Sequence, residues 1–284
     1  MTLTIKTAVE PRILELEQGV ELRVPAGIFT PEDHRYVATG DRLIEKCEAA
    51  WSTTSLDPIP LNFRLVGPPG VGKNAVVYEL GKRSKKPVFI MLGHEDLTAE
   101  DMIATAALDR NGGVRYTASP LLAAMLHGGI CFIDEIAKMR PRALAPLASV
   151  LDERRSISSA LLGRDFEAEP GFRFCAAYNP TDIDAFDLPP WLRRRTVPEF
   201  NVAPPKVPAL MKILNGEGPQ GSAEFETLRN EIMGKAKELK LTLDPSTAIT
   251  LVKYALRLSE YARSGRGNVG NVVDLAFKHV CGRE

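Results

Sequence analysis

The chain lacks several features that would place a protein in a common class. Its 284 residues include 36 acidic and 36 basic side chains, so no net charge attracts nucleic acid. No apolar run is long enough to cross a bilayer, and residues 1–6 lack the basic-then-apolar layout of a signal peptide. Internal repeats and low-complexity tracts are also absent. We therefore expect a cytoplasmic globular protein with no membrane span and no nucleic-acid partner.

Cysteine is scarce, with four residues at positions 47, 131, 175 and 281. Their spacing matches no zinc-binding pattern. Cys131 and Cys175 lie inside apolar runs, which is typical of cysteines that act as small buried hydrophobes in a reducing compartment.

The central part of the chain alternates apolar runs with helical patterns. A chain of this length buries about three quarters of its unfolded surface and can form one large domain or two smaller ones. Apolar runs occur at 61–66, 87–92, 129–133 and 172–177, and amphipathic segments separate them. This order predicts an α/β fold with a parallel sheet, helices on both faces and right-handed crossovers.

Three hairpins and a helical region are expected around this sheet. Polar and apolar residues alternate over 1–25, an Asn-Gly turn lies within 107–116, and a third hairpin spans about 155–170. A helix is expected at about 41–52.

The composition changes at 203–206, where Ala-Pro-Pro-Lys precedes a run of helical patterns. Asp244-Pro245 is a favourable start for one of these helices. We predict helices near 206–215, 222–239, 245–262 and 269–281. The predicted domains are a hairpin extension at 1–25, an α/β domain at 26–203 and a small all-α domain at 204–284.

The most informative stretch is the glycine-rich run 65–74, which separates an apolar segment from a helix-prone one. Its glycines let successive N–H groups point into one concavity that suits phosphate, and the following helix adds its positive end. Lys73 places a positive charge near the outer phosphates. A turn that binds nothing is the alternative. The predicted phosphate-binding residues are Gly67, Pro68, Pro69, Gly70, Val71, Gly72, Lys73, Asn74 and Ala75.

Asn74 departs from the usual form of this loop, which ends in Ser or Thr with a hydroxyl on Mg²⁺. An amide oxygen can also bind a hard cation, although the Asn side chain is longer. We therefore predict phosphate binding, with Asn74 and a carboxylate as the candidate Mg²⁺ ligands.

That carboxylate is Asp134, which with Glu135 ends the apolar segment 129–135. In an open parallel sheet, ligands bind beyond the carboxyl ends of the strands, where the glycine-rich loop also begins. Asp134 can therefore reach Mg²⁺, and Glu135 can orient and polarise an attacking water. Solvated acids at the end of a strand are the alternative interpretation.

Two further segments carry candidate chemistry. Asn179 follows the strand-like run 172–178 and can hydrogen-bond a γ-phosphate or the water, although an Asn-Pro turn alone would explain it. Arg193, Arg194 and Arg195 begin a helix after two prolines, and an arginine there can stabilise the charge of phosphoryl transfer. A solvated basic surface or an acid-binding patch is the alternative for the arginines.

The order of loop, Asp-Glu strand, strand-end Asn, arginine cluster and helical region resembles the AAA+ ATPases over about 61–204. Within that superfamily the chain is most similar to the MoxR type, in its CbbQ/NorQ-like, dynein-related branch. Segments 127–135, 145–155 and 177–180 carry this likeness. The resemblance implies a P-loop NTPase fold with a helical lid.

The resemblance also implies assembly into a ring, commonly a hexamer, with an arginine finger from the neighbouring subunit. Arg195 is the first choice for the finger, followed by Arg194 and Arg193, and Arg140 and Arg142 could also face the neighbour. In this family the two internal hairpins line the pore or contact a client.

Two more positions take roles only through the resemblance. His94 lies where the family has a polar residue that restrains the catalytic glutamate, although an ordinary strand-end histidine fits equally well. A lid arginine of the family would fall near Gly270, where Arg266 is the candidate substitute and a simple turn residue within 264–267 is the alternative.

The leading hypothesis is an ATPase that uses Mg²⁺ and ATP, with GTP as the alternative nucleotide, to remodel a partner protein. By resemblance, that partner could carry a von Willebrand A domain. One alternative is a nucleotide-binding structural subunit with little turnover, which Asn74 would favour. A nucleic-acid motor is another, and the neutral net charge argues against it.

Overall fold

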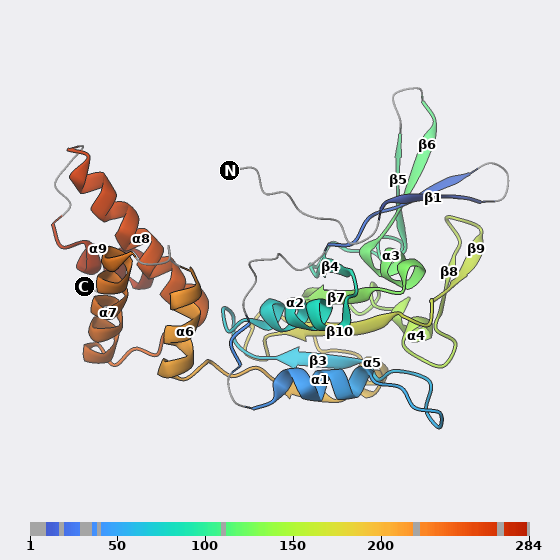
Figure 1. The fold of residues 1–284 in the computed structure, drawn as a ribbon. Coiled ribbons are helices and arrows are strands. Elements are labelled where there is room, and N and C mark those ends of the chain that lie inside the picture. Colours follow the sequence, from blue (N-terminus) through green and yellow to red (C-terminus); the bar gives the residue numbers. More distant parts are fainter. Residues whose placement is uncertain are drawn as a thin grey trace. The chain divides into compact units, whose positions relative to one another are not determined.

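The computed structural model describes residues 10–16, 20–28, 36–38, 41–108, 112–217, 222–265 and 270–282. The chain divides into two compact units, which are considered separately below (Figure 1). The described residues of Met1–His34, Arg42–Gly67 and Lys73–Val202 form the first unit, and those of Arg35–Asp41, Pro68–Gly72 and Ala203–Glu284 form the second.

The first unit is built on a five-stranded sheet in the order β11-β3-β10-β7-β4, with every neighbouring pair parallel. Its strands are β3 (Phe63–Val66), β4 (Val88–Leu92), β7 (Ile130–Asp134), β10 (Arg173–Tyr178) and β11 (Glu199–Asn201). Four of them lie in the expected apolar runs, which confirms the parallel α/β sheet. The edge strand β11 was not expected, because three residues with one apolar side chain carry almost no pattern.

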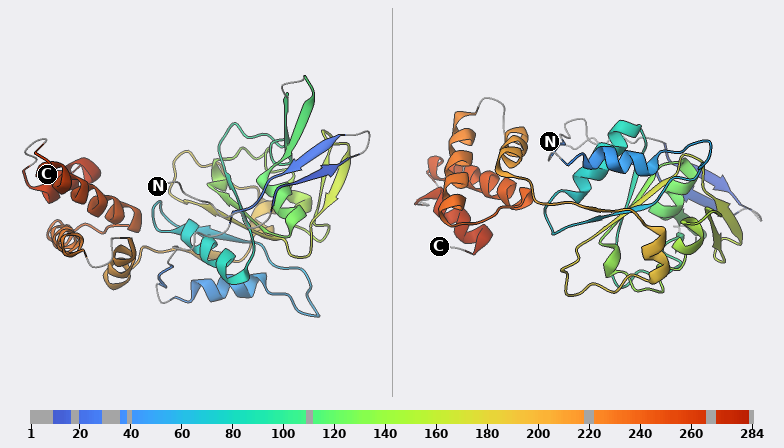
Figure 2. Two further views of the ribbon diagram at one scale, coloured as in Figure 1. Left: turned by 45° about the horizontal axis from the view of Figure 1, so that its top comes forward. Right: turned by 90° about the horizontal axis from the view of Figure 1, so that it is seen from below.

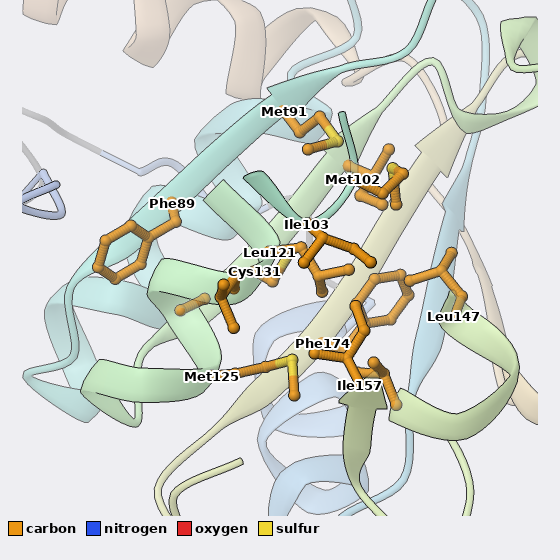
Figure 3. Packing of buried hydrophobic residues seen from close by; sticks show 14 of the residues in the cluster. Phe89, Met91, Met102, Ile103, Leu121, Met125, Cys131, Leu147, Ile157 and Phe174 are labelled. Carbon is orange, nitrogen blue, oxygen red and sulfur yellow. The ribbon is translucent and has the colours of Figure 1, made fainter. Parts of the chain in front are cut away.

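Helices cover both faces of this sheet. Because side chains alternate along a strand, Phe89, Cys131 and Phe174 share one face and pack against α3 (Pro120–His127), as Figure 3 shows. On the other face, the ring centroid of Trp51 in α1 (Leu43–Trp51) lies 4.9 Å from that of Phe63. The remaining helices in the described part of this unit are α2 (Lys73–Ser84), η2 (Ile136–Lys138), α4 (Leu147–Val150) and α5 (Pro190–Arg195).

A second sheet joins two hairpins that are far apart in sequence. Its order is β1-β2-β6-β5, with β1 (Arg12–Glu15), β2 (Glu21–Val24), β5 (Ala104–Leu108) and β6 (Val114–Ala118). Both hairpins were expected, and the turn residue Asn111 lies outside the described residues. The parallel pairing of β2 with β6 was not expected. It follows from tertiary packing, because Leu22 and Val24 are fully buried against the core.

The third expected hairpin is confirmed as β8 (Ser156–Ser159) and β9 (Arg164–Glu167). Gly163 takes a φ of 67° at its turn, a conformation that glycine adopts without steric cost. Buried Ile157 and Phe166, one from each strand, attach the hairpin to the main core.

The second unit contains four helices in its described residues, as expected for the helical region. They are α6 (Val207–Glu217), α7 (Ala223–Glu238), α8 (Pro245–Arg263) and α9 (Val272–Cys281), which pack together in both views of Figure 2. Asp244 caps α8 as predicted, since its carboxylate accepts hydrogen bonds from Thr247 N at 3.0 Å and Thr247 Oγ1 at 2.6 Å. Among the described residues, no helix combines the length and apolarity that a membrane span requires.

Candidate functional site

Strands β3, β10 and β7 of the first unit end next to one another, and the predicted site residues lie at or just beyond these ends. Val66 of β3 is in register with Tyr178 of β10, and Ile133 of β7 is in register with Ala176. The backbone N–H of Gly67 also donates to the carbonyl of Tyr178 at 3.4 Å. The structure therefore brings Gly67, Asp134 and Asn179 to one edge of the sheet.

The glycine-rich loop connects β3 to α2, and two of its residues require glycine. Gly70 and Gly72 have φ values of 77° and 99°, in the left-handed range that disfavours other residues. Helix α2 begins at Lys73 immediately after the loop, so the positive N-terminal end of the helix dipole follows the glycines. Asn74 lies exposed in the first turn of α2.

Lys73 is a buried cation, with 7% of its surface exposed. Its Nζ donates a hydrogen bond to the carbonyl of Gly67 at 2.8 Å. Burial lowers the pKa of Lys73 below its ordinary value, and the charges of Glu135 and Asp134 act in the opposite direction. The sheet edge therefore carries one buried positive charge close to two carboxylates.

Asp134 and Glu135 differ in their backbone setting. Asp134 ends β7, and its Oδ1 accepts a hydrogen bond from the N–H of Glu135 at 3.0 Å. Burial and the charge of Asp134 raise the pKa of Tyr78, which indicates that Asp134 lies near α2. Glu135 has a φ of 54° and a ψ of 39°, an uncommon left-handed conformation for a non-glycine residue. This turn sends the chain from β7 into η2.

Asn179 has two potential roles that involve different atoms. Only 8% of the residue is exposed, and its Oδ1 accepts hydrogen bonds from Thr181 N at 3.2 Å and Thr181 Oγ1 at 3.0 Å. These bonds form the Asn-Pro turn that was the alternative interpretation of the sequence. No hydrogen bond links Asn179 Nδ2 to another described residue, so the buried amide group has a donor available for a ligand.

The three arginines of α5 differ in how they are held. The guanidinium of Arg195 donates to the carbonyl of Ala148 at 2.6 Å and pairs with Asp152 at 3.2 Å. Arg193 pairs with Asp187 at 3.0 Å in an exposed position. Arg194 is exposed, and its side chain makes no ion pair or hydrogen bond with another described residue. Of the three arginines, Arg194 is therefore the one whose guanidinium is not held by other described residues of this chain.

Arg64 contributes to this arrangement and was missed from the sequence. It is 6% exposed within β3, where its guanidinium contacts Glu199 at 2.8 Å, Thr196 Oγ1 at 2.6 Å and the carbonyl of Arg193 at 3.2 Å. These bonds connect the central strand β3 to Arg193 and Thr196, the two ends of the segment 193–196. A charged residue inside an otherwise apolar strand was the signal available in the sequence.

Arg193 and Asn179 also face a common space. They line a polar hollow of about 360 Å³ in the first unit, together with Arg64 and Glu199. The structure therefore brings the strand-end amide and the start of the arginine cluster to the same hollow.

Of the other predicted positions, none that the structure describes shares a hydrogen bond or ion pair with Asp134, Glu135 or Asn179. His94 is exposed and makes no hydrogen bond with Glu135 among the described residues. Arg140 pairs with Glu95 at 3.4 Å, and Arg142 is exposed. Arg266 lies outside the described residues.

Comparison with known proteins places this geometry in a family. Residues 62–196, which contain the loop, Asp134, Glu135, Asn179 and the arginines, match the AAA domain of the dynein-related subfamily. These residues are therefore similar to the AAA domain of that subfamily. The resemblance to the MoxR type is confirmed by its relatives, which include protein NorQ of Paracoccus denitrificans and protein CbbQ of Hydrogenophilus thermoluteolus.

The chain is 31% identical to NorQ and 33% identical to CbbQ, in both cases over 145 residues. These alignments cover 51% of this chain and 51% of each relative, so the chain spans about half the length of the curated relatives that it matches. A solved structure of the Thermotoga maritima RuvB P216G mutant has a TM-score of 0.56 and 16% identity, covering 88% of this chain and 73% of that one. The expected P-loop NTPase fold of the AAA+ type is confirmed.

Proposed function

We propose that this protein is a MoxR-type AAA+ ATPase that binds ATP with Mg²⁺, hydrolyses it within a ring of identical subunits and remodels or activates a partner protein. The observation that carries the proposal is the gathering of Lys73, Asp134, Glu135 and Asn179 at the edge of the sheet where the glycine-rich loop begins. A buried cation beside two acids and a buried amide donor suits a triphosphate and an attacking water.

Phosphate binding is assigned to the loop N–H groups and to Lys73, which follows the loop directly in sequence. The burial of Lys73 supports this role, because a charge removed from water interacts strongly with an incoming anion. The hydrogen bond from Lys73 to the Gly67 carbonyl holds the ammonium group at the start of the loop. ATP and GTP share the triphosphate that these groups would recognise, and the family resemblance favours ATP.

The donor set fits a hard cation such as Mg²⁺. Asp134 offers a carboxylate and Asn74 an amide oxygen, and Mg²⁺ in nucleotide sites takes one or two carboxylates together with phosphate oxygens. Among the described residues, no cluster of three or more His, Cys, Asp or Glu side chains could hold a metal by itself. When bound, Mg²⁺ would neutralise charge on the phosphate oxygens.

Glu135 and Asn179 are assigned to the reacting water and the γ-phosphate. The carboxylate of Glu135 would accept a hydrogen bond from the water and polarise it for attack. The Nδ2 group of Asn179 would donate to a γ-phosphate oxygen or to the same water, because its Oδ1 is already bonded to Thr181.

The site would be completed by an arginine of the neighbouring subunit. The sequence favoured Arg195, but its guanidinium is bonded to the carbonyl of Ala148 and to Asp152 of the same subunit. The proposal therefore assigns the finger to Arg194, and Arg195 becomes the residue that anchors α5. An added positive charge at the γ-phosphate is worth several orders of magnitude in rate.

The partner is proposed from the family resemblance, which favours a protein client that could carry a von Willebrand A domain. The three hairpins give the first unit surfaces beyond the nucleotide site for such contacts. We also propose a cytoplasmic location, because Cys131 and Cys175 are fully buried thiols, as expected in a reducing compartment.

The test compares purified wild-type protein with Lys73→Ala and Glu135→Gln. We expect Lys73→Ala to lose nucleotide binding, measured by calorimetry with Mg-ATP. Glu135→Gln should bind ATP with wild-type affinity, lose hydrolysis except for a low residual rate of phosphate release, and form rings that are more stable in size-exclusion chromatography. Unchanged phosphate release by Glu135→Gln would refute the catalytic assignment, and intact affinity in Lys73→Ala would refute the phosphate site.

A second candidate function, a nucleotide-binding structural subunit, is favoured by Asn74 in place of Ser or Thr. Such a subunit would use the nucleotide as an assembly ligand that stabilises the folded state by linkage. Tight ATP binding by the wild type, without phosphate release even after assembly, would decide for this function. Restoring the usual hydroxyl with Asn74→Thr should raise turnover if Asn74 limits it.

A further inference from the structure

Gly93 lies directly beyond β4, beside the first residues after β7. Its N–H donates to the carbonyl of Asp134 at 2.8 Å, which extends the pairing of Leu92 with Asp134 by one step. Gly93 is buried, although the next residue, His94, is exposed. The backbone of Gly93 therefore runs alongside the Asp134–Glu135 peptide.

The space beside Gly93 admits no side chain. A Cβ at this position would lie 2.4 Å from the carbonyl oxygen of Glu135, 3.0 Å from its carbonyl carbon and 3.0 Å from Cγ of Met139. The first distance is far below any normal contact, and the atom concerned belongs to the backbone. The φ of Gly93 is not in the positive range that favours glycine. Close approach to Glu135, and not backbone conformation, is therefore what requires glycine here.

The crowded peptide belongs to the residue with the uncommon backbone conformation. Glu135 has a φ of 54°, and its carbonyl accepts a hydrogen bond from Lys138 N at 2.9 Å, which closes the η2 turn. The residues that follow cannot readily shift, since Ile136 and Met139 are fully buried. A displacement of the Glu135 carbonyl would therefore rotate the Glu135 peptide and redirect its side chain.

We infer that Gly93 is a positioning residue, which acts through the backbone of Glu135 to aim that carboxylate at the reacting water. By lacking a Cβ, it lets the end of β4 press against Glu135 and hold the left-handed turn. The inference rests on the proposed function, because it assigns Gly93 to the hydrolysis step. It predicts that a single added methyl group at residue 93 impairs hydrolysis and leaves nucleotide binding intact.

The test variant is Gly93→Ala, and Gly171→Ala is its matched control. A Cβ at Gly171 would lie 2.8 Å from the carbonyl oxygen of Gly128 and 2.9 Å from Lys86 Nζ, so it also crowds a backbone carbonyl. Gly171 precedes β10, at the amino ends of the parallel strands, whereas Glu135 follows the carboxyl end of β7. The control therefore tests local crowding without contact to the proposed site.

Hydrolysis and binding are measured separately for the wild type and both variants, with circular dichroism to confirm folding. We expect kcat of Gly93→Ala to fall about a hundredfold while the Kd for Mg-ATP stays within about twofold, since small misplacements of a catalytic group are that costly. Gly171→Ala should keep the wild-type kcat. In the Glu135→Gln background, Gly93→Ala should lower the residual rate no further, because both changes remove the same function.

Three outcomes would overturn the inference while the proposed function stands. They are a Gly93→Ala rate close to that of the wild type, a further loss of rate in the Glu135→Gln background, and unfolding of Gly93→Ala when Gly171→Ala folds. The last would make Gly93 a general requirement of the fold. A wild-type protein without turnover would instead remove the proposed function, and with it the step that Gly93 is inferred to serve.

Discussion

Asn179 offers a prediction in which the two roles of one side chain can be separated. Its Oδ1 holds the turn through Thr181, and its Nδ2 is the donor proposed for the γ-phosphate or the water. Asn179→Ala removes both functions. Thr181→Val removes only the 3.0 Å bond from the Thr181 hydroxyl, and it leaves the Thr181 N–H and the whole Asn179 side chain in place.

The contacts set the expected sizes of the two effects. Each hydrogen bond to Oδ1 contributes about 0.5–1.5 kcal/mol, so Asn179→Ala should lower the free energy of unfolding by about 1–3 kcal/mol and Thr181→Val by about 1 kcal/mol. Loss of a preorganised donor to developing charge costs about 10²–10³ in kcat, equivalent to about 3–4 kcal/mol. Asn179→Ala should therefore lose turnover far beyond its loss of stability, and Thr181→Val should not.

The assay combines steady-state phosphate release with denaturant unfolding for both variants, well below their unfolding midpoints. Nucleotide affinity is followed in parallel, because the loss should appear in kcat and leave Kd nearly unchanged. If Asn179→Ala and Thr181→Val hydrolyse ATP at the same rate, Asn179 is a turn residue and its proposed contact with the γ-phosphate is wrong.

Three other predictions follow from the structure. Arg194→Ala should lower ATP turnover by about 10³ or more without changing the free energy of unfolding, and mixing it with Glu135→Gln subunits should restore activity. Arg195→Ala should mainly lower the free energy of unfolding, by about 1–2 kcal/mol. Phosphate release and thermal unfolding measure both, and the reverse pattern would contradict the assignment. Asp244→Ala should destabilise the helical unit by about 0.5–2 kcal/mol through loss of the α8 cap, with Asp244→Asn as the control that keeps it. Hydrogen bonds from Arg154, with smaller support from Arg195, lower the pKa of Asp152 below its ordinary 3.8. The stabilisation from this carboxylate is therefore present above pH 4 and lost as the pH falls through the lowered pKa. The melting temperature of Asp152→Asn should therefore fall less steeply with acid than that of the wild type. The same fall in both proteins would contradict this prediction.

Much of the fold and of the candidate site could be predicted from the sequence, because the deciding signals are local. The glycines at 67, 70 and 72 and the lysine that follows specify a loop at a helix start. The buried strands at 130–134 and 173–178 are continuous apolar runs, and parallel strands bring whatever follows them to one edge. The convergence of Asp134 and Asn179 needed only the order of these elements and the handedness of their connections.

Other features depend on contacts between residues far apart in the chain, and the tertiary structure decided them. The pairing of β2 with β6 arises because Leu22 and Val24 must be buried, and no local pattern specifies their partner. The sequence favoured Arg195 over Arg194 as the finger, because the groups that hold Arg195, Asp152 and the carbonyl of Ala148, reach it only through folding.

Gly93 marks the same limit most clearly. In the sequence it is a glycine at a strand end, where many residues would serve. In the folded chain, the carbonyl of Glu135 occupies the volume that any side chain would need. The chain by itself determined which elements form and which residues end them, because backbone preference and hydrophobic period act over a few residues. Packing decided which of those residues touch, because excluded volume and hydrogen bonding act between segments that only the fold brings together.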